Sequence, residues 1–92
     1  MHRDIDRLIA KVRRDYPDVA VEQLRVSHPG ADDDGLWFFK HPSTSSEVQV
    51  ESSTGAVPFL IESDREAPAE ALTIEQGMAL VVARLGLVAG TA

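Results

Sequence analysis

The sequence has no cysteine, so neither a disulfide bond nor a thiolate metal site can form. It contains no Gly-x-Ser-x-Gly, P-loop or dinucleotide-binding fingerprint, which are short motifs of hydrolases and nucleotide-binding proteins. No apolar run is long enough to span a membrane, and no apolar signal segment follows the initial Met-His-Arg-Asp. We therefore expect a cytoplasmic protein that does not bind membranes.

Basic side chains are scarce beyond residue 16. Residues 1–16 carry five basic and three acidic side chains, the remainder carries four and twelve, and the formal net charge is −6. A nucleic-acid binder is not expected, because phosphate neutralisation needs a basic surface. The basic residues Arg3, Arg7, Lys11 and Arg14 share one side of the first predicted helix. They could hold an acidic partner, but a solvated helix face is the commoner meaning of such a stripe.

The length predicts one domain over residues 1–92, with residues 88–92 as a fraying tail. A chain of this size buries only roughly 60 to 65% of the surface that its unfolded form exposes. There is room for one small core, and a deep, enclosed active site would be hard to build.

Two segments have helical periodicity. Ile5, Leu8 and Val12 recur at helical spacing, which predicts a helix from Asp4 to Tyr16 with Asp4 as its N-cap. Thr73-Ile74-Glu75-Gln76 is a capping-box sequence, so a second helix should begin there. It should end at Gly86, in a Schellman motif with Leu87 against Val82.

Strand patterns lie between the two helices. The predicted strands are Val19 to Ser27, with a bulge near Glu22 or a buried start, Leu36 to Lys40, Glu47 to Ser52, and Val57 to Glu62. Residues 28–35 are dense in turn formers, and Ser63 to Leu72, with no clear apolar period, is expected to be a surface loop. The order predicts an α+β domain: a four-stranded antiparallel meander sheet with the N-terminal and the C-terminal helix packed on one face.

The strand register follows from keeping large apolar side chains on one face. Placing Ser52 opposite Val57 pairs Val50 with Phe59 and Val48 with Ile61. Pairing Phe39 with Val48 and Trp37 with Val50 adds the preceding strand. The predicted core therefore lies between one sheet face and both helices. The sheet residues are Trp37, Phe39, Val48, Val50, Phe59 and Ile61, and the helix residues are Ile5, Leu8, Val12, Met78, Val81 and Leu85.

The same register predicts the composition of the other sheet face. Phe38, Gln49 and Leu60 align in one row with Leu36 beside it, and Glu47 lies directly opposite Glu62. Nearby Arg25 or Lys40 could neutralise these two carboxylates. Apolar side chains with a charged rim are typical of a protein contact. The predicted interaction residues are Leu36, Phe38, Gln49, Leu60, Glu47 and Glu62.

Three catalytic or binding chemistries compete with this surface. One is an acid/base pair of the Glu47 and Glu62 carboxylates, which water would screen on an open face. The histidines His2, His28 and His41 and the run Asp32 to Asp34 could ligate a metal, but His28 and His41 fall at opposite ends of the second strand. His41 with Ser43, Ser45 or Ser46 could be a nucleophilic pair, although serines in a turn more often bind nearby backbone. We expect no metal and no cofactor.

The sequence thus favours a small non-enzymatic protein-interaction module. It would bind itself, as a homodimer, or another protein, through the open sheet face or the acidic loops. An inhibitor of a basic protein would suit such an acidic domain, by analogy alone. The alternative is a small enzyme or ligand-binding domain that uses His41, the Ser43 to Ser46 turn and Glu47.

Overall fold

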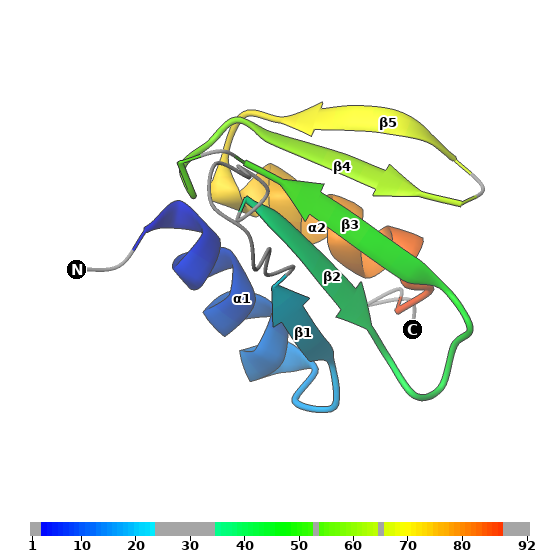
Figure 1. Ribbon diagram of the computed structural model, residues 1–92. Helices are drawn as coiled ribbons and strands as arrows, with labels where there is room; N and C mark the ends of the chain where they lie inside the picture. Colours follow the sequence, from blue (N-terminus) through cyan, green and yellow to red (C-terminus); the bar gives the residue numbers. More distant parts are fainter. Residues whose placement is uncertain (1–2, 24–34, 53, 65, 88–92) are drawn as a thin grey trace, which may run out of the picture.

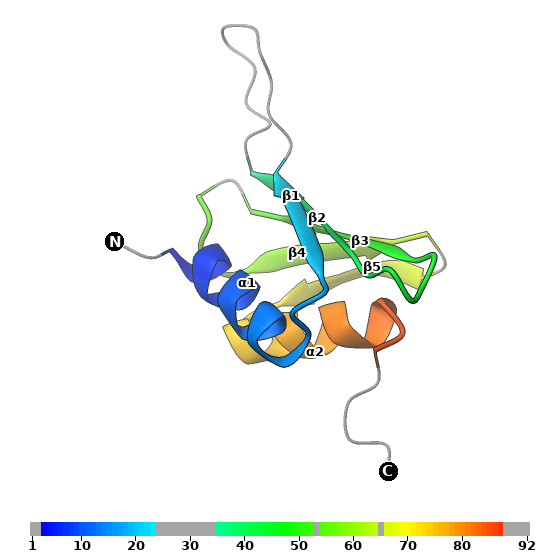
Figure 2. The ribbon, with the colours of Figure 1, turned by 90° about the horizontal axis from the view of Figure 1, so that it is seen from below.

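The computed structural model describes residues 3–23, 35–52, 54–64 and 66–87 (Figure 1). The described elements, in chain order, are α1 (Asp4–Asp15), β1 (Ala20–Gln23), β2 (Leu36–Lys40), β3 (Glu47–Glu51), β4 (Phe59–Ser63), β5 (Glu66–Ala71) and α2 (Ile74–Arg84). The strands form one antiparallel sheet in the order β1-β2-β3-β4-β5. Both helices lie on the same face of the sheet, where they pack against each other (Figure 2). The α+β prediction is confirmed, but the sheet has five strands.

The fifth strand, β5, replaces the surface loop that the sequence predicted for Ser63 to Leu72. Phe59 pairs with Ala71 and Leu60 with Glu70, and Ala71 is fully buried. Pro68 is tolerated because β5 lies at the edge of the sheet, where one row of backbone amides needs no partner strand. Glutamates and a proline also discourage another chain from adding to this edge.

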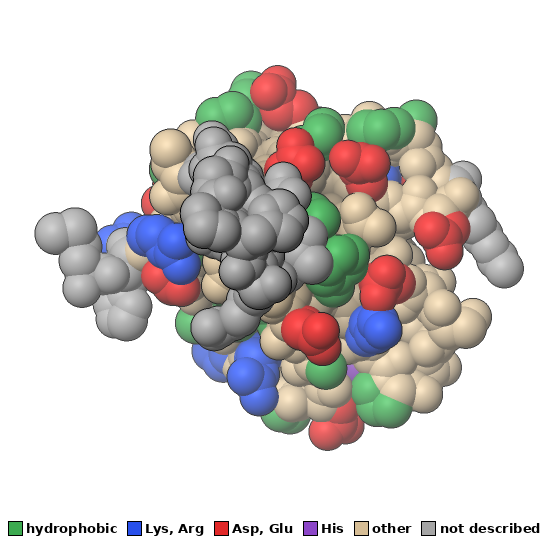
Figure 3. Space-filling view, in the orientation of Figure 1, with side chains coloured by type: hydrophobic (Ala, Val, Ile, Leu, Met, Phe, Trp, Pro, Cys, Tyr) green, Lys and Arg blue, Asp and Glu red, His purple; other side chains and the backbone are tan. Residues whose placement is uncertain are grey.

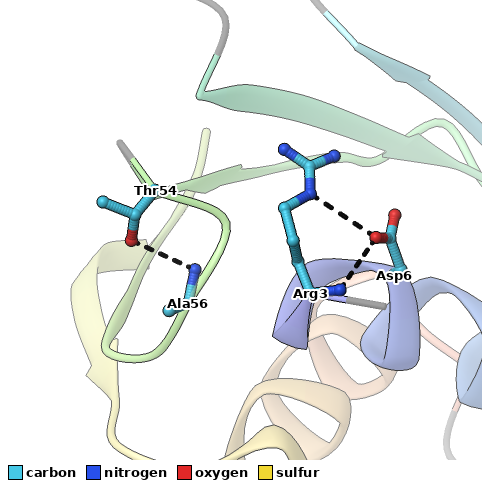
Figure 4. A network of polar contacts seen from close by, with 4 residues as sticks. All are labelled: Arg3, Asp6, Thr54 and Ala56. Carbon is cyan, nitrogen blue, oxygen red and sulfur yellow. Dashed lines mark hydrogen bonds and ion pairs between the residues drawn. The ribbon is translucent and has the colours of Figure 1, made fainter. Parts of the chain in front are cut away.

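The first turn of α1 is anchored differently from the prediction. The N-cap residue is Arg3, and its backbone N–H donates to the Asp6 carboxylate at 3.0 Å (Figure 4). Asp4, predicted as the N-cap, instead accepts a hydrogen bond from the backbone N–H of Val57 at 3.0 Å. The helix start and the loop before β4 therefore hold each other in place.

That loop, between β3 and β4, packs tightly on the helix start. The backbone N–H of Ile5 donates to the Gly55 carbonyl at 2.8 Å, and Gly55 has φ +79°. The positive φ favours glycine here, and a Cβ at Gly55 would in addition lie 2.8 Å from Cδ of Arg3, so that side chain would have to shift. Thr54 Oγ1 accepts from the Ala56 N–H at 3.3 Å within the same turn (Figure 4).

The ends of α2 follow the sequence signals closely. The Thr73 hydroxyl accepts from the Gln76 N–H at 3.0 Å, as predicted, while the Gln76 side chain accepts from the N–H of Leu72 rather than that of Thr73. At the other end Gly86 has φ +80°. The N–H groups of Gly86 and Leu87 donate to the carbonyls of Ala83 and Val82, which is the Schellman pattern.

The core lies between the helices and one face of the sheet. The fully or nearly fully buried apolar residues include all six predicted sheet positions, Trp37, Phe39, Val48, Val50, Phe59 and Ile61, and the predicted helix positions Ile5, Leu8, Val12, Val81 and Leu85, with Met78 only partly buried. Gly77 lets α2 approach the sheet, since a Cβ there would lie 3.1 Å from the Phe59 ring. The inward face of the sheet was thus predicted correctly.

The register between β3 and β4 was predicted two residues away from the observed one. Val50 pairs with Ile61 and Val48 with Ser63, whereas β2 and β3 pair as predicted. The residues before Phe59 belong to the loop held by α1, so β4 begins later than expected. A shift of two residues keeps every side chain on its predicted face but changes its neighbours.

The first strand is shorter in the described chain than the predicted Val19 to Ser27. Ala20 to Gln23 pair with β2 without interruption, so no bulge occurs at Glu22, and Val19 is a buried start with 1% exposure. Residues 24–34 lie outside the described residues, and so the predictions of a strand over residues 24–27 and of a turn over residues 28–34 are not described. Within the described chain, neither helix has the length and apolar character needed to cross a bilayer.

Candidate functional site

The sheet face opposite the helices combines apolar and acidic side chains. Leu36 and Phe38 of β2 and Leu60 of β4 point to this face and are only partly buried. Neither of the two described helices packs on it (Figures 1 and 2). In the space-filling view, which looks onto this face, hydrophobic patches alternate with carboxylates (Figure 3). We call it the open face.

The observed register divides the apolar residues of the open face between two rows. Phe38 lies between Glu22 and Gln49, and Glu62 follows Gln49 in the same row. Leu36 and Leu60 flank Glu51 in the neighbouring row, which Glu70 closes at the edge. The predicted row of Phe38, Gln49 and Leu60 is therefore wrong, because Leu60 lies opposite Glu51 and not opposite Gln49. All predicted interaction residues nevertheless lie on the open face.

Most carboxylates of the open face lack a positive partner among the residues that the structure describes. Glu47 does not lie opposite Glu62 as predicted; it lies opposite Lys40, whose Nζ is 3.1 Å from Glu47 Oε2. Lys40 thus neutralises Glu47, and it is one of the two basic residues that the sequence analysis named for this role. Within the described chain, no ion pair is formed by the other glutamates of this face, Glu22, Glu51, Glu62 and Glu70. The face is therefore strongly negative.

A shallow hollow of about 220 Å³ opens on this face across β1, β2 and β3. Its lining residues are Ala20, Glu22, Phe38, Lys40 and Glu47. Strand pairing brings them together, since Glu22 lies opposite Phe38 and Lys40 lies opposite both Ala20 and Glu47. Sequence reasoning named Phe38 and Glu47 but missed Glu22, because the phase of the first strand was uncertain from its apolar residues.

The predicted catalytic alternative forms a local contact in the turn after β2. Ser43 Oγ lies 2.7 Å from His41 Nδ1, and the Ser43 backbone N–H also donates to that nitrogen at 3.1 Å. The ring nitrogen is therefore an acceptor, and the serine hydroxyl donates to it. No carboxylate among the described residues hydrogen-bonds His41, so nothing orients the imidazole as in a catalytic triad. The arrangement is that of a side chain stabilising its own turn.

Metal ligation has no geometric support in the part of the chain that is described. Within it, no group of three or more His, Asp or Glu side chains is placed to hold an ion. His41 belongs to the described residues, whereas His2, His28 and Asp32 to Asp34 lie outside them.

Arg84 is a buried cation that sequence reasoning did not single out. It comes from the last turn of α2, and its side chain is only 7% exposed. Its guanidinium donates to the carbonyls of Ile61 at 3.2 Å and Ala67 at 2.8 Å, and to Ser63 Oγ at 3.4 Å. Nε lies 3.4 Å from Glu66 Oε2 but outside hydrogen-bond geometry. Arg84 lines a small polar hollow, but its bonded atoms hold β4 and β5 to α2, which is a structural task.

Comparisons of the chain with protein-family models, with curated proteins and with solved structures gave no match.

Proposed function

We propose that this protein is a non-enzymatic interaction module whose open face binds another protein. The observation that carries the proposal is the grouping of Leu36, Phe38 and Leu60 among carboxylates on a sheet face that neither described helix covers. Apolar anchors surrounded by a polar rim are the usual composition of a protein contact surface.

The competing catalytic function has less support. The hydroxyl of Ser43 is within reach of His41, but both groups are committed to one turn, and no third group from the described residues hydrogen-bonds the imidazole. The hollow beside this turn is wide and open, and polar and apolar residues both line it: Asp18, Ala20, Lys40, His41, Pro42, Thr44, Ser45, Ser46 and Glu47. A water-excluding site for bond cleavage is not evident in it.

A photo-crosslinking amino acid tests the contact surface inside the cell of origin. It replaces Gln49, at the centre of the open face, and in a control protein it replaces Ala79, which is exposed on α2. We expect a crosslinked protein adduct from position 49 and none of the same mass from position 79. The adduct should disappear when Phe38→Glu is added.

Absence of an adduct from position 49, or the same adduct from both positions, would contradict the proposal. Persistence of the adduct in the Phe38→Glu protein would also contradict it, provided that circular dichroism shows an unchanged fold.

A further inference from the structure

We propose that the hollow formed by Ala20, Glu22, Phe38, Lys40 and Glu47 receives an arginine side chain of a basic protein partner. The inference rests on the proposed function, because it specifies what kind of partner meets the open face. It goes further in assigning one residue type to one place on that face.

The charge of the hollow selects a cation. Glu22 and Glu47 contribute two carboxylates, and among the described residues only Glu47 has an ion-pair partner, Lys40. The Glu47 side chain is 34% exposed and the Lys40 side chain 65%, so solvent reaches the pair and a second cation can approach Glu47. A cation placed here is attracted by both carboxylates and compensates the charge of Glu22, which has no ion-pair partner in the described part of the chain.

The aromatic residue in the hollow favours arginine over lysine. Phe38 lies directly opposite Glu22 in the strand pair. A guanidinium stacks on an aromatic ring through its planar face and can bind a carboxylate through its edge at the same time. The ammonium of lysine is a compact, strongly hydrated point charge that does not combine the two contacts as well.

The wider face indicates a foreign partner rather than a second copy. Glu51, Glu62 and Glu70 continue the negative charge beyond the hollow, and each lacks an ion pair within the described chain. Two open faces brought together around a two-fold axis would place like charges against each other. A basic surface would neutralise these carboxylates while its apolar residues cover Leu36 and Leu60.

The test compares two blocked tripeptides by nitrogen-15 NMR titration at low ionic strength. One is acetyl-Leu-Arg-Leu-amide, and the other carries citrulline, which keeps the shape of arginine but has no charge. We expect saturable shifts of the amide signals of β1 and β2 with the arginine peptide, and about fivefold weaker binding of the citrulline peptide.

A variant pair then locates the site. Glu22→Gln should weaken binding of the arginine peptide about threefold. Glu75→Gln, the same change at an exposed position of α2, should leave it unchanged. Equal affinity of the two peptides, shifts that map away from β1 and β2, or no effect of Glu22→Gln would overturn the assignment.

The two experiments separate the two proposals. If position 49 yields a specific adduct while the arginine peptide does not bind, the open face is a contact surface and the arginine assignment is wrong. If the arginine peptide binds the hollow while no adduct forms, the hollow binds a cation, but the proposed function and the protein partner inferred from it both fail.

Discussion

At the scale of single residues, Arg84 shows how backbone groups can satisfy a buried charge. Its guanidinium donates to two backbone carbonyls, from Ile61 in β4 and Ala67 in β5, at the point where the pairing of these strands becomes irregular. The guanidinium thereby joins the two strands where their pairing is irregular. A single arginine in the last turn of a predicted helix gives no such signal, because it is equally typical of a solvated helix end.

We predict that Arg84→Met destabilises the fold by about 2 to 4 kcal/mol, because it removes the donors to the partly buried Ile61 carbonyl and Ser63 hydroxyl and to the Ala67 carbonyl. Arg14→Met is the matched control. Arg14 is exposed, and its one ion-pair partner among the described residues is the adjacent Asp15, so its loss should change the free energy of unfolding by less than about 0.5 kcal/mol. Urea unfolding measures both, and equal midpoints for the two variants would show that Arg84 has no structural role.

At the scale of helices and strands, predictability follows the strength of the local pattern. Both helices were found because apolar residues recur at helical spacing. Thr73 and Gly86 cap the two ends of α2 as predicted. β5 was missed because an edge strand with one proline and exposed acidic residues has no alternating apolar pattern. β5 forms a strand because it pairs with β4, and its own side chains give no pattern that predicts this pairing.

The β3–β4 register illustrates a second limit. Its error came from assuming a tight turn, whereas Asp4 and Ile5 of the distant α1 hold Val57 and Gly55 in a longer loop. Side-chain alternation decides which face a residue occupies, and a shift of two residues does not change the face. The predicted core residues were therefore still correct. The neighbours across the open face depend on the exact register, so the composition of the candidate site was only partly predictable.

The two faces of the sheet should respond differently to truncation. Phe59 is fully buried against Gly77 of α2, and Phe59→Ala should cost about 3 to 5 kcal/mol through lost burial and a cavity. Phe38 is partly exposed on the open face, so Phe38→Ala should lower the free energy of unfolding by only about 1 kcal/mol. Thermal and urea unfolding of the two variants compare them directly. If both cost the same, Phe38 belongs to a covered core and the open face does not exist in solution.

At the scale of the whole molecule, charge is distributed unevenly between two sides. The formal net charge is −6, yet exposed basic residues such as Arg13 and Arg14 lie on α1, which is on the side of the sheet opposite the open face (Figure 2). Such asymmetry accelerates encounter with an oppositely charged partner and makes the association rate fall as salt is added. It also makes face-to-face pairing of two identical molecules unfavourable, although the sequence alone left a homodimer open.

Sedimentation velocity over a wide concentration range decides between self-association and a foreign partner. We predict that the wild type sediments as a 10.0 kDa monomer at neutral pH and moderate salt, because the unpaired glutamates of two open faces would repel each other. The matched control is the double variant Phe38→Glu with Leu60→Glu, which should sediment identically if the wild type is monomeric. A wild-type dimer that dissociates in this variant, with the fold intact by circular dichroism, would instead make the open face a homodimer interface and remove the need for a basic partner.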